Sequence, residues 1–86
     1  MKIAKTENFI KRYKKLPLNI QKKTDKQILL LSQNLRHPSL RSKKLEGFSD
    51  VWEGRVDRHY RFVFIIESDT IILLRVGVHD EGLGKK

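Results

Sequence analysis

Several residue types are missing or scarce in this chain of 86 residues. It contains no cysteine, which excludes disulfides and thiolate metal sites and fits a reducing cytoplasm. No apolar run approaches the ~20 residues needed to cross a bilayer, and the start, "MKIAKTENFIKRYKK", has no apolar signal-peptide centre. We therefore expect a cytoplasmic protein with no membrane partner. The length predicts a single domain over residues 1–86.

Acidic residues are also in the minority. Ten Asp and Glu stand against nineteen Lys and Arg, so the formal net charge is +9. This much like charge opposes a compact fold unless something anionic lies nearby. The composition favours nucleic acid or an acidic protein as the partner.

The first half of the chain has helical spacing. Residues 2–5 predict a short strand, and Thr6 is placed as the N-cap of a helix that reaches Leu16. Pro17 suits the first turn of a second helix, which runs from about residue 18 to 35. These two helices are expected to pack as a hairpin.

The second half changes to an alternating pattern. Residues 39–50 form a polar, basic loop without a clear period, and strands are expected at 51–56, 60–67 and 70–78. Helices followed by strands predict an α+β domain. Its N-terminal helical hairpin would pack on a twisted antiparallel sheet of three to four strands.

The segment "VWEGRVDRHYRFVF" predicts a β-hairpin with residues 57–59 as its loop. This register pairs Trp52 with Phe64 and Arg55 with Arg61. One face then carries only apolar and aromatic residues, which indicates a core face. The predicted core face consists of Trp52, Val56, Tyr60, Phe62 and Phe64. The opposite face consists of Glu53, Arg55, Arg61 and Val63.

The pairing of Arg55 with Arg61 needs an explanation. Like charges directly opposite on a sheet destabilise it by roughly 0.2–1 kcal/mol. A one-residue slip would remove the clash but would mix apolar and charged faces, which costs more. Either Glu53 bridges the two guanidinium groups as part of a solvated ion cluster, or a bound phosphate separates them. The sequence leaves both possibilities open.

Arg75 and His79 share one face of the last strand. A two-residue loop before that strand would put them opposite the Arg61 face, and a three-residue loop would put them on it. Gly54 lies inside a strand, where it indicates a bulge or a close backbone approach.

Three segments, "HPSLRSKKLEG", "VWEGRVDRHYRFVFII" and "TIILLRVGVHD", together resemble the RelE/ParE superfamily of toxins from type II toxin–antitoxin systems. The resemblance implies a RelE-like fold and a ribonuclease that enters the ribosomal A site and cuts mRNA. The RNA 2′-hydroxyl would attack its own phosphodiester, with no metal or cofactor. It also implies a cognate acidic antitoxin that wraps the domain.

Carried over by position, Arg55 and Arg61 match the strand cations of the family, and His79 matches the catalytic residue at the strand end. Lys43 and Lys44 match the basic loop that holds the RNA backbone. The further cations expected to contact RNA are Arg41, Arg58 and Arg75. In two places the chain departs from RelE: Glu53 stands where RelE has a lysine, and no tyrosine follows His79. A histidine at the strand end is closer to the YoeB and YafQ branches.

Such a reaction needs a stabiliser of phosphoryl charge, an acid and a base. Arginine stays protonated, so Arg55 and Arg61 are assigned as stabilisers. His79 is assigned as the acid, and the base would be Glu53, Asp80 or a lysine. Two alternatives remain: a ParE-like toxin that binds DNA gyrase without cutting RNA, and an inactive relative.

Overall fold

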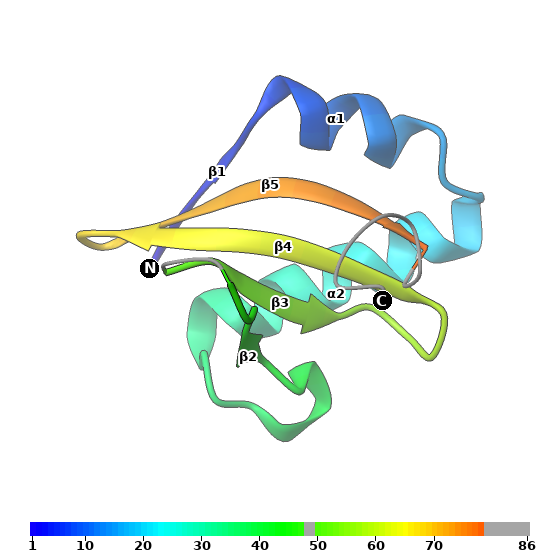
Figure 1. The fold of residues 1–86 in the computed structure, drawn as a ribbon. Coiled ribbons are helices and arrows are strands. Elements are labelled where there is room, and N and C mark those ends of the chain that lie inside the picture. The colour runs from blue at the N-terminus through cyan, green and yellow to red at the C-terminus, as the bar shows by residue number, and fades with distance from the viewer. Residues whose placement is uncertain (48–49, 79–86) are drawn as a thin grey trace.

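The computed structural model describes residues 1–47 and 50–78. Within them the chain forms two α-helices, a short 3-10 helix and one sheet (Figure 1). The elements, in chain order, are β1 (Lys2–Lys5), α1 (Glu7–Lys14), α2 (Leu18–Gln33), η1 (Pro38–Leu40), β2 (Lys43–Lys44), β3 (Trp52–Arg55), β4 (Tyr60–Glu67) and β5 (Thr70–Val78).

The five strands have the spatial order β1-β5-β4-β3-β2. The pairs β2–β3, β3–β4 and β4–β5 are antiparallel, whereas β1 is parallel to β5. The predicted α+β class is confirmed, but the expectation of three to four strands in a fully antiparallel sheet was too narrow. The basic loop also contains more structure than predicted, because η1 extends into it and β2 lies within it. With three residues in η1 and two in β2, neither element is long enough to show a period in the sequence.

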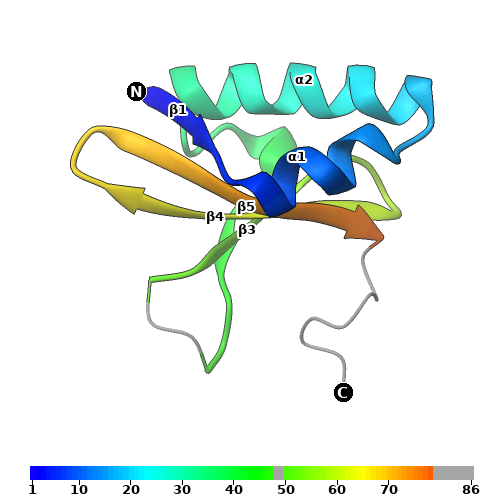
Figure 2. The same ribbon diagram turned by 90° about the horizontal axis from the view of Figure 1, so that it is seen from above.

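Both α-helices lie on the same face of the sheet (Figure 2). The core fills the space between the helices and this face, with Phe9 and Leu31 from the helices against strand residues that are at most 1% exposed. No helix in residues 1–47 and 50–78 covers the opposite face, which we call the open face. None of the described helices is long and apolar enough to span a membrane.

The start of α1 is tied to β5. The Thr6 hydroxyl accepts a hydrogen bond from the Phe9 N–H at 3.1 Å, which confirms the predicted N-cap. The same hydroxyl donates to the Leu74 carbonyl at 3.0 Å, and the Asn8 side-chain amide donates to that carbonyl at 3.2 Å. The cap therefore also fixes the helix to the sheet.

The β3–β4 hairpin has the predicted register, with Trp52 opposite Phe64 and Arg55 opposite Arg61. Gly54 lies opposite Phe62, and a Cβ atom on Gly54 would come within 2.5 Å of the Phe62 ring. The Phe62 ring thus occupies the space of a side chain at Gly54, so the glycine makes room for a ring and not for the bulge or close backbone approach that its position suggested.

A β-bulge decides which face Arg75 occupies. The β4–β5 turn has two residues, because Glu67 pairs with Thr70. The register then shifts by one residue between Val63 and Phe64, so that Arg75 pairs with Val63. Arg75 therefore shares the open face with Arg61. The prediction that a two-residue loop would place it on the other face was wrong because an extra residue in β5 inverts the alternation.

Candidate anion-binding face

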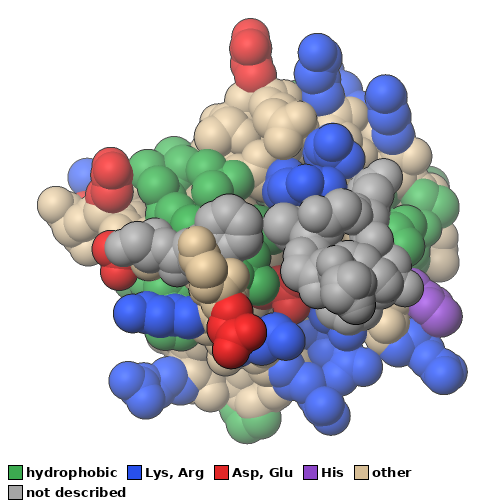
Figure 3. Space-filling view, viewed as in Figure 1, with side chains coloured by type: hydrophobic (Ala, Val, Ile, Leu, Met, Phe, Trp, Pro, Cys, Tyr) green, Lys and Arg blue, Asp and Glu red, His purple; other side chains and the backbone are tan. Residues whose placement is uncertain are grey.

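The side chains of Arg55 and Arg61 are half-buried on the open face, the face turned toward the viewer in Figures 1 and 3. Arg61 Nη1 donates to the Asp57 carbonyl at 2.6 Å and to the Tyr60 carbonyl at 3.0 Å. Arg55 Nε donates to the same Asp57 carbonyl at 3.4 Å. Two guanidinium groups thus converge on one backbone oxygen. This oxygen is a partner that the sequence did not disclose, beside the two possibilities of Glu53 and phosphate.

The side chain of Asp57 stabilises the turn that supplies this carbonyl. Its Oδ1 accepts hydrogen bonds from the His59 N–H at 2.8 Å and the Tyr60 N–H at 3.0 Å. Its Oδ2 lies 3.4 Å from Lys23 Nζ on α2. Burial alone would raise the pKa of Asp57, but the two N–H donors and the Lys23 charge outweigh it, and the pKa lies below its usual value.

Glu53 is the buried acid of this face, with 5% of its surface exposed. Its carboxylate lies 3.9 Å from Lys43 Nζ. The pKa of Arg61 is lowered, first by burial and then by the charge of Arg55, with a smaller contribution from Arg41. Glu53 and Asp57 act in the opposite direction and favour the charged guanidinium. The arginine pair is therefore held at an electrostatic cost that an added anion would relieve.

The remaining predicted cations divide between two faces. Lys43, Glu53, Val63 and Arg75 follow one another across four neighbouring strands, so Lys43 and Arg75 share the open face. Lys44 points to the other face, where its Nζ lies 5.7 Å from the centre of the Trp52 ring. The two lysines that match the family's basic loop therefore lie on opposite faces of the sheet.

Two further cations flank the pair. Arg41 is exposed, in a left-handed conformation with φ 46°, and its charge reaches Arg61. Arg58 is exposed in the hairpin loop, and Figure 3 shows Lys and Arg side chains crowded over this end of the face. His79, the predicted acid, and Asp80 lie outside the described residues.

Gln27 is a residue that sequence reasoning missed. It is buried on α2, and its amide donates to the Arg55 carbonyl at 2.8 Å and to the Ser39 carbonyl at 3.2 Å. It joins the helix to the strand that carries Arg55. The signal was present in the sequence, because Thr24 and Gln27 interrupt the apolar side of α2 between Ile20 and Leu31.

No group of three or more His, Cys, Asp or Glu side chains that could hold a metal ion occurs within the described ranges. The chemistry available on this part of the open face is that of guanidinium and ammonium groups around a buried carboxylate. Such a surface suits a phosphate-bearing ligand.

The sequence matches the family model of the ParE toxin of the type II toxin–antitoxin system parDE over residues 3–82. The chain belongs to this family. The predicted membership of the RelE/ParE superfamily is thereby confirmed. No curated protein sequence gave a match.

Solved structures show the same fold. A copper-bound mutant toxin from Helicobacter pylori is 26% identical, with a TM-score of 0.79, and the match covers 96% of this chain and 99% of that one. A chain of the RelB–RelE antitoxin–toxin complex from Methanococcus jannaschii is 26% identical, with a TM-score of 0.73 and coverage of 90% and 91%. A YoeB/ParE toxin from Agrobacterium tumefaciens, 16% identical with coverage of 92% and 99% and a TM-score of 0.79, supports the fold alone. This chain is thus a type II toxin with the RelE/YoeB/YafQ fold.

Proposed function

We propose that this toxin is an endoribonuclease that cuts mRNA in the ribosomal A site and that the open face binds the RNA backbone. The observation that supports it is the convergence of Arg55 and Arg61 on the Asp57 carbonyl. This shared acceptor holds the two guanidinium groups side by side, as binding of one phosphate by both groups requires. A phosphate brings negative charge as well as acceptors, so it satisfies the pair better than a neutral carbonyl does.

In the proposed reaction the RNA 2′-hydroxyl attacks the adjacent phosphorus, and the bond to the leaving 5′-oxygen breaks. Arg55 and Arg61 stabilise the charge that develops on the phosphoryl oxygens. His79 protonates the leaving oxygen. The reaction yields a cyclic phosphate and a free 5′-hydroxyl and needs no metal.

The role of Glu53 follows from its burial. With 5% of its surface exposed and Lys43 Nζ 3.9 Å away, it fits an internal neutraliser of the arginine pair better than a base that must reach the RNA. The proton of the 2′-hydroxyl then passes to Asp80. Arg41, Arg58, Arg75 and Lys43 hold the flanking phosphates.

An acidic antitoxin is the proposed protein partner. The net charge of +9 favours an acidic partner, and the family is defined by toxin–antitoxin pairs. Two similar structures are named as toxins in complexes with the antitoxins RelB and YefM. The toxin and its antitoxin would meet in the cytoplasm, where the ribosomes are.

The test is cleavage of a ribosome-bound message by wild type and by Arg55→Ala, Arg61→Ala and His79→Ala. Each of the three variants is expected to lose cleavage. The control is Lys22→Ala, which removes an exposed lysine near the start of α2 and should cut like wild type. An intact message with the wild-type protein would overturn the proposal.

The family match favours a second candidate. ParE-like toxins of the superfamily act on DNA gyrase without cutting RNA, and the matched family model is that of ParE. The same preparation added to a gyrase supercoiling assay distinguishes the two. Inhibited supercoiling together with an uncut message would support the gyrase binder.

A further inference from the structure

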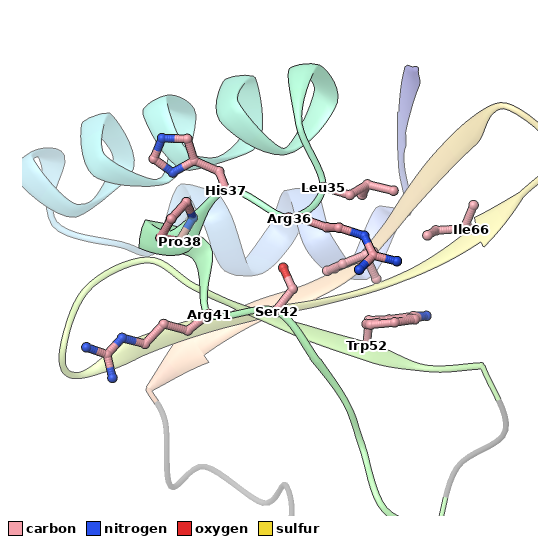
Figure 4. A pocket seen from close by; sticks show the side chains of 9 residues that line it. Leu35, Arg36, His37, Pro38, Arg41, Ser42, Trp52 and Ile66 are labelled. Atoms are coloured by element: carbon pink, nitrogen blue, oxygen red, sulfur yellow. The ribbon is translucent and has the colours of Figure 1, made fainter.

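A pocket lies away from the arginine pair, between the end of α2, η1 and the core-facing side of β3 and β4 (Figure 4). Its volume is about 440 Å³, within the range of roughly 300–1,000 Å³ typical of ligand sites. Leu35, Trp52, Phe64 and Ile66 give it an apolar lining. The Trp52 ring stacks on Phe64 with the ring planes 17° apart, so the apolar lining has a fixed shape.

The rim of the pocket is cationic. Arg36 and Arg41 line it, and both are exposed. Neither guanidinium group has an ion-pair partner in the described part of the chain. Figure 4 shows the Arg36 guanidinium on the side of the pocket that also carries Trp52. An occupant that combines an apolar group with carboxylates matches this distribution of charge.

A polar group in the pocket wall also lacks a partner. The Ser42 hydroxyl oxygen is buried and makes no hydrogen bond, and Figure 4 shows it pointing toward the pocket between Arg36 and Pro38. A buried hydroxyl without a partner destabilises the free protein. An occupant that brings a carbonyl or an N–H group to this wall would satisfy it.

We propose that this pocket anchors an acidic peptide segment of a partner protein, which inserts an apolar side chain against Trp52 and pairs its carboxylates with Arg36 and Arg41. The inference rests on the partner named in the proposed function and not on RNA cleavage. A peptide is favoured over RNA because the lining is apolar and a peptide supplies both the side chain and the carboxylates. Arg41 also contributes to the field at Arg61, so a carboxylate paired with Arg41 would also change the field at the arginine pair.

Trp52 is the single tryptophan of the chain, so its fluorescence reports on this pocket directly. The probes are a short peptide of Glu and Asp with one central leucine, the same peptide with serine in place of leucine, and a short single-stranded RNA. The leucine peptide is expected to change the fluorescence saturably and to bind about tenfold more tightly than the serine peptide. Equal binding of both peptides would overturn the inference, because it would leave only general charge attraction.

Three variants locate the effect. Arg36→Glu should weaken the leucine peptide by about tenfold, whereas Lys22→Glu, with the same charge change at the far end of α2, should weaken it by no more than about twofold. Ser42→Leu fills the pocket without removing any core side chain, so it should abolish binding of the peptide while the protein stays folded. Unchanged affinity in Ser42→Leu would place the peptide elsewhere and overturn the inference.

RNA cleavage separates this inference from the proposed function. Arg36→Glu should cut a ribosome-bound message like wild type, because Arg36 is not part of the proposed catalytic face. Peptide binding without cleavage by the wild type would refute the nuclease and keep the pocket. If RNA saturates the Trp52 signal in Arg61→Ala and displaces the peptide, the pocket is an RNA site and the inference fails.

Discussion

The two faces of the sheet are built on opposite principles. The helix-covered face holds side chains such as Phe62, Phe64 and Leu73, which are at most 1% exposed and belong to the hydrophobic core. The open face holds Arg55 and Arg61 side by side over a buried Glu53. Burial of apolar surface stabilises the first face, whereas partial burial and then the like charge of Arg55 lower the pKa of Arg61 on the second. One face thus provides the stability, and the other is left with unfavourable electrostatics that a ligand can relieve.

The largest expected effect separates the two faces by activity. If the proposed function is correct, Arg61→Ala should reduce cleavage of a ribosome-bound message by about 10²–10³-fold, the usual cost of losing one charge-stabilising donor. The free energy of unfolding should change by no more than about 1 kcal/mol, because removing the cation also removes its repulsion from Arg55. Cleavage rates and urea unfolding on the same preparation measure both. A large loss of stability would show that the open face also holds the fold together.

A second prediction concerns the core face. Gly54→Ala should lower the free energy of unfolding by about 1–3 kcal/mol, because the new Cβ would lie 2.5 Å from the fully buried Phe62 ring. Urea unfolding measures the change. The matched test is a double-mutant cycle with Phe62→Leu, in which the smaller side chain makes room and part of the Gly54→Ala cost disappears. Additive costs would mean that the strain does not come from this contact.

The turn that joins β3 and β4 gives a smaller, pH-dependent effect on the free energy of unfolding. Asp57→Asn keeps an acceptor for the His59 and Tyr60 N–H groups but loses the charge near Lys23, so at pH 7 it should cost about 1 kcal/mol. The folded-state pKa of Asp57 lies below its unfolded value, so this stabilisation is fully present above the unfolded pKa and is lost as the pH falls through the folded pKa. The free energies of unfolding of wild type and Asp57→Asn, measured from pH 7 down to about 2, should therefore converge at the acid end. A constant difference would contradict the assignment.

The smallest effect is a spectroscopic one on the helix layer. The Tyr13 hydroxyl donates to Asp25 Oδ1 at 2.7 Å, and this bond, with burial and the Asp25 charge, raises the pKa of Tyr13 to about 12. Asp25→Asn should bring this pKa toward the usual ~10. Phenolate absorbance during an alkaline titration measures it, with Tyr60→Phe as the background because the chain has two tyrosines. An unchanged titration would show that the bond does not form in solution.

Periodicity predicted the parts of the fold that repeat. The Thr6 cap, the order of the helices and the register from Trp52–Phe64 to Arg55–Arg61 all follow from patterns that extend over many residues. β2 and the bulge at Leu74 could not be predicted from such patterns, because each depends on one or two residues held by contacts with distant parts of the chain.

The candidate site, like the fold, could be predicted only where it follows the alternation of the strands. Alternation on the hairpin placed Arg55 and Arg61 opposite each other. It could not reveal that a backbone carbonyl lies between them, since carbonyls have no sequence signature. It also could not place Arg75, whose face depends on the bulge.

The extra residue in β5 determines how this chain tolerates a change of length. If Leu74 were deleted, Leu73 could still pair with Phe64 and Arg75 with Val63, and the β4–β5 ladder would become regular. Thr6 and Asn8, however, would lose the carbonyl that holds the first turn of α1. Shortening the strand at this one position would leave the pairing intact and free the helix, whereas a deletion elsewhere in β5 would turn the following side chains over to the wrong surface.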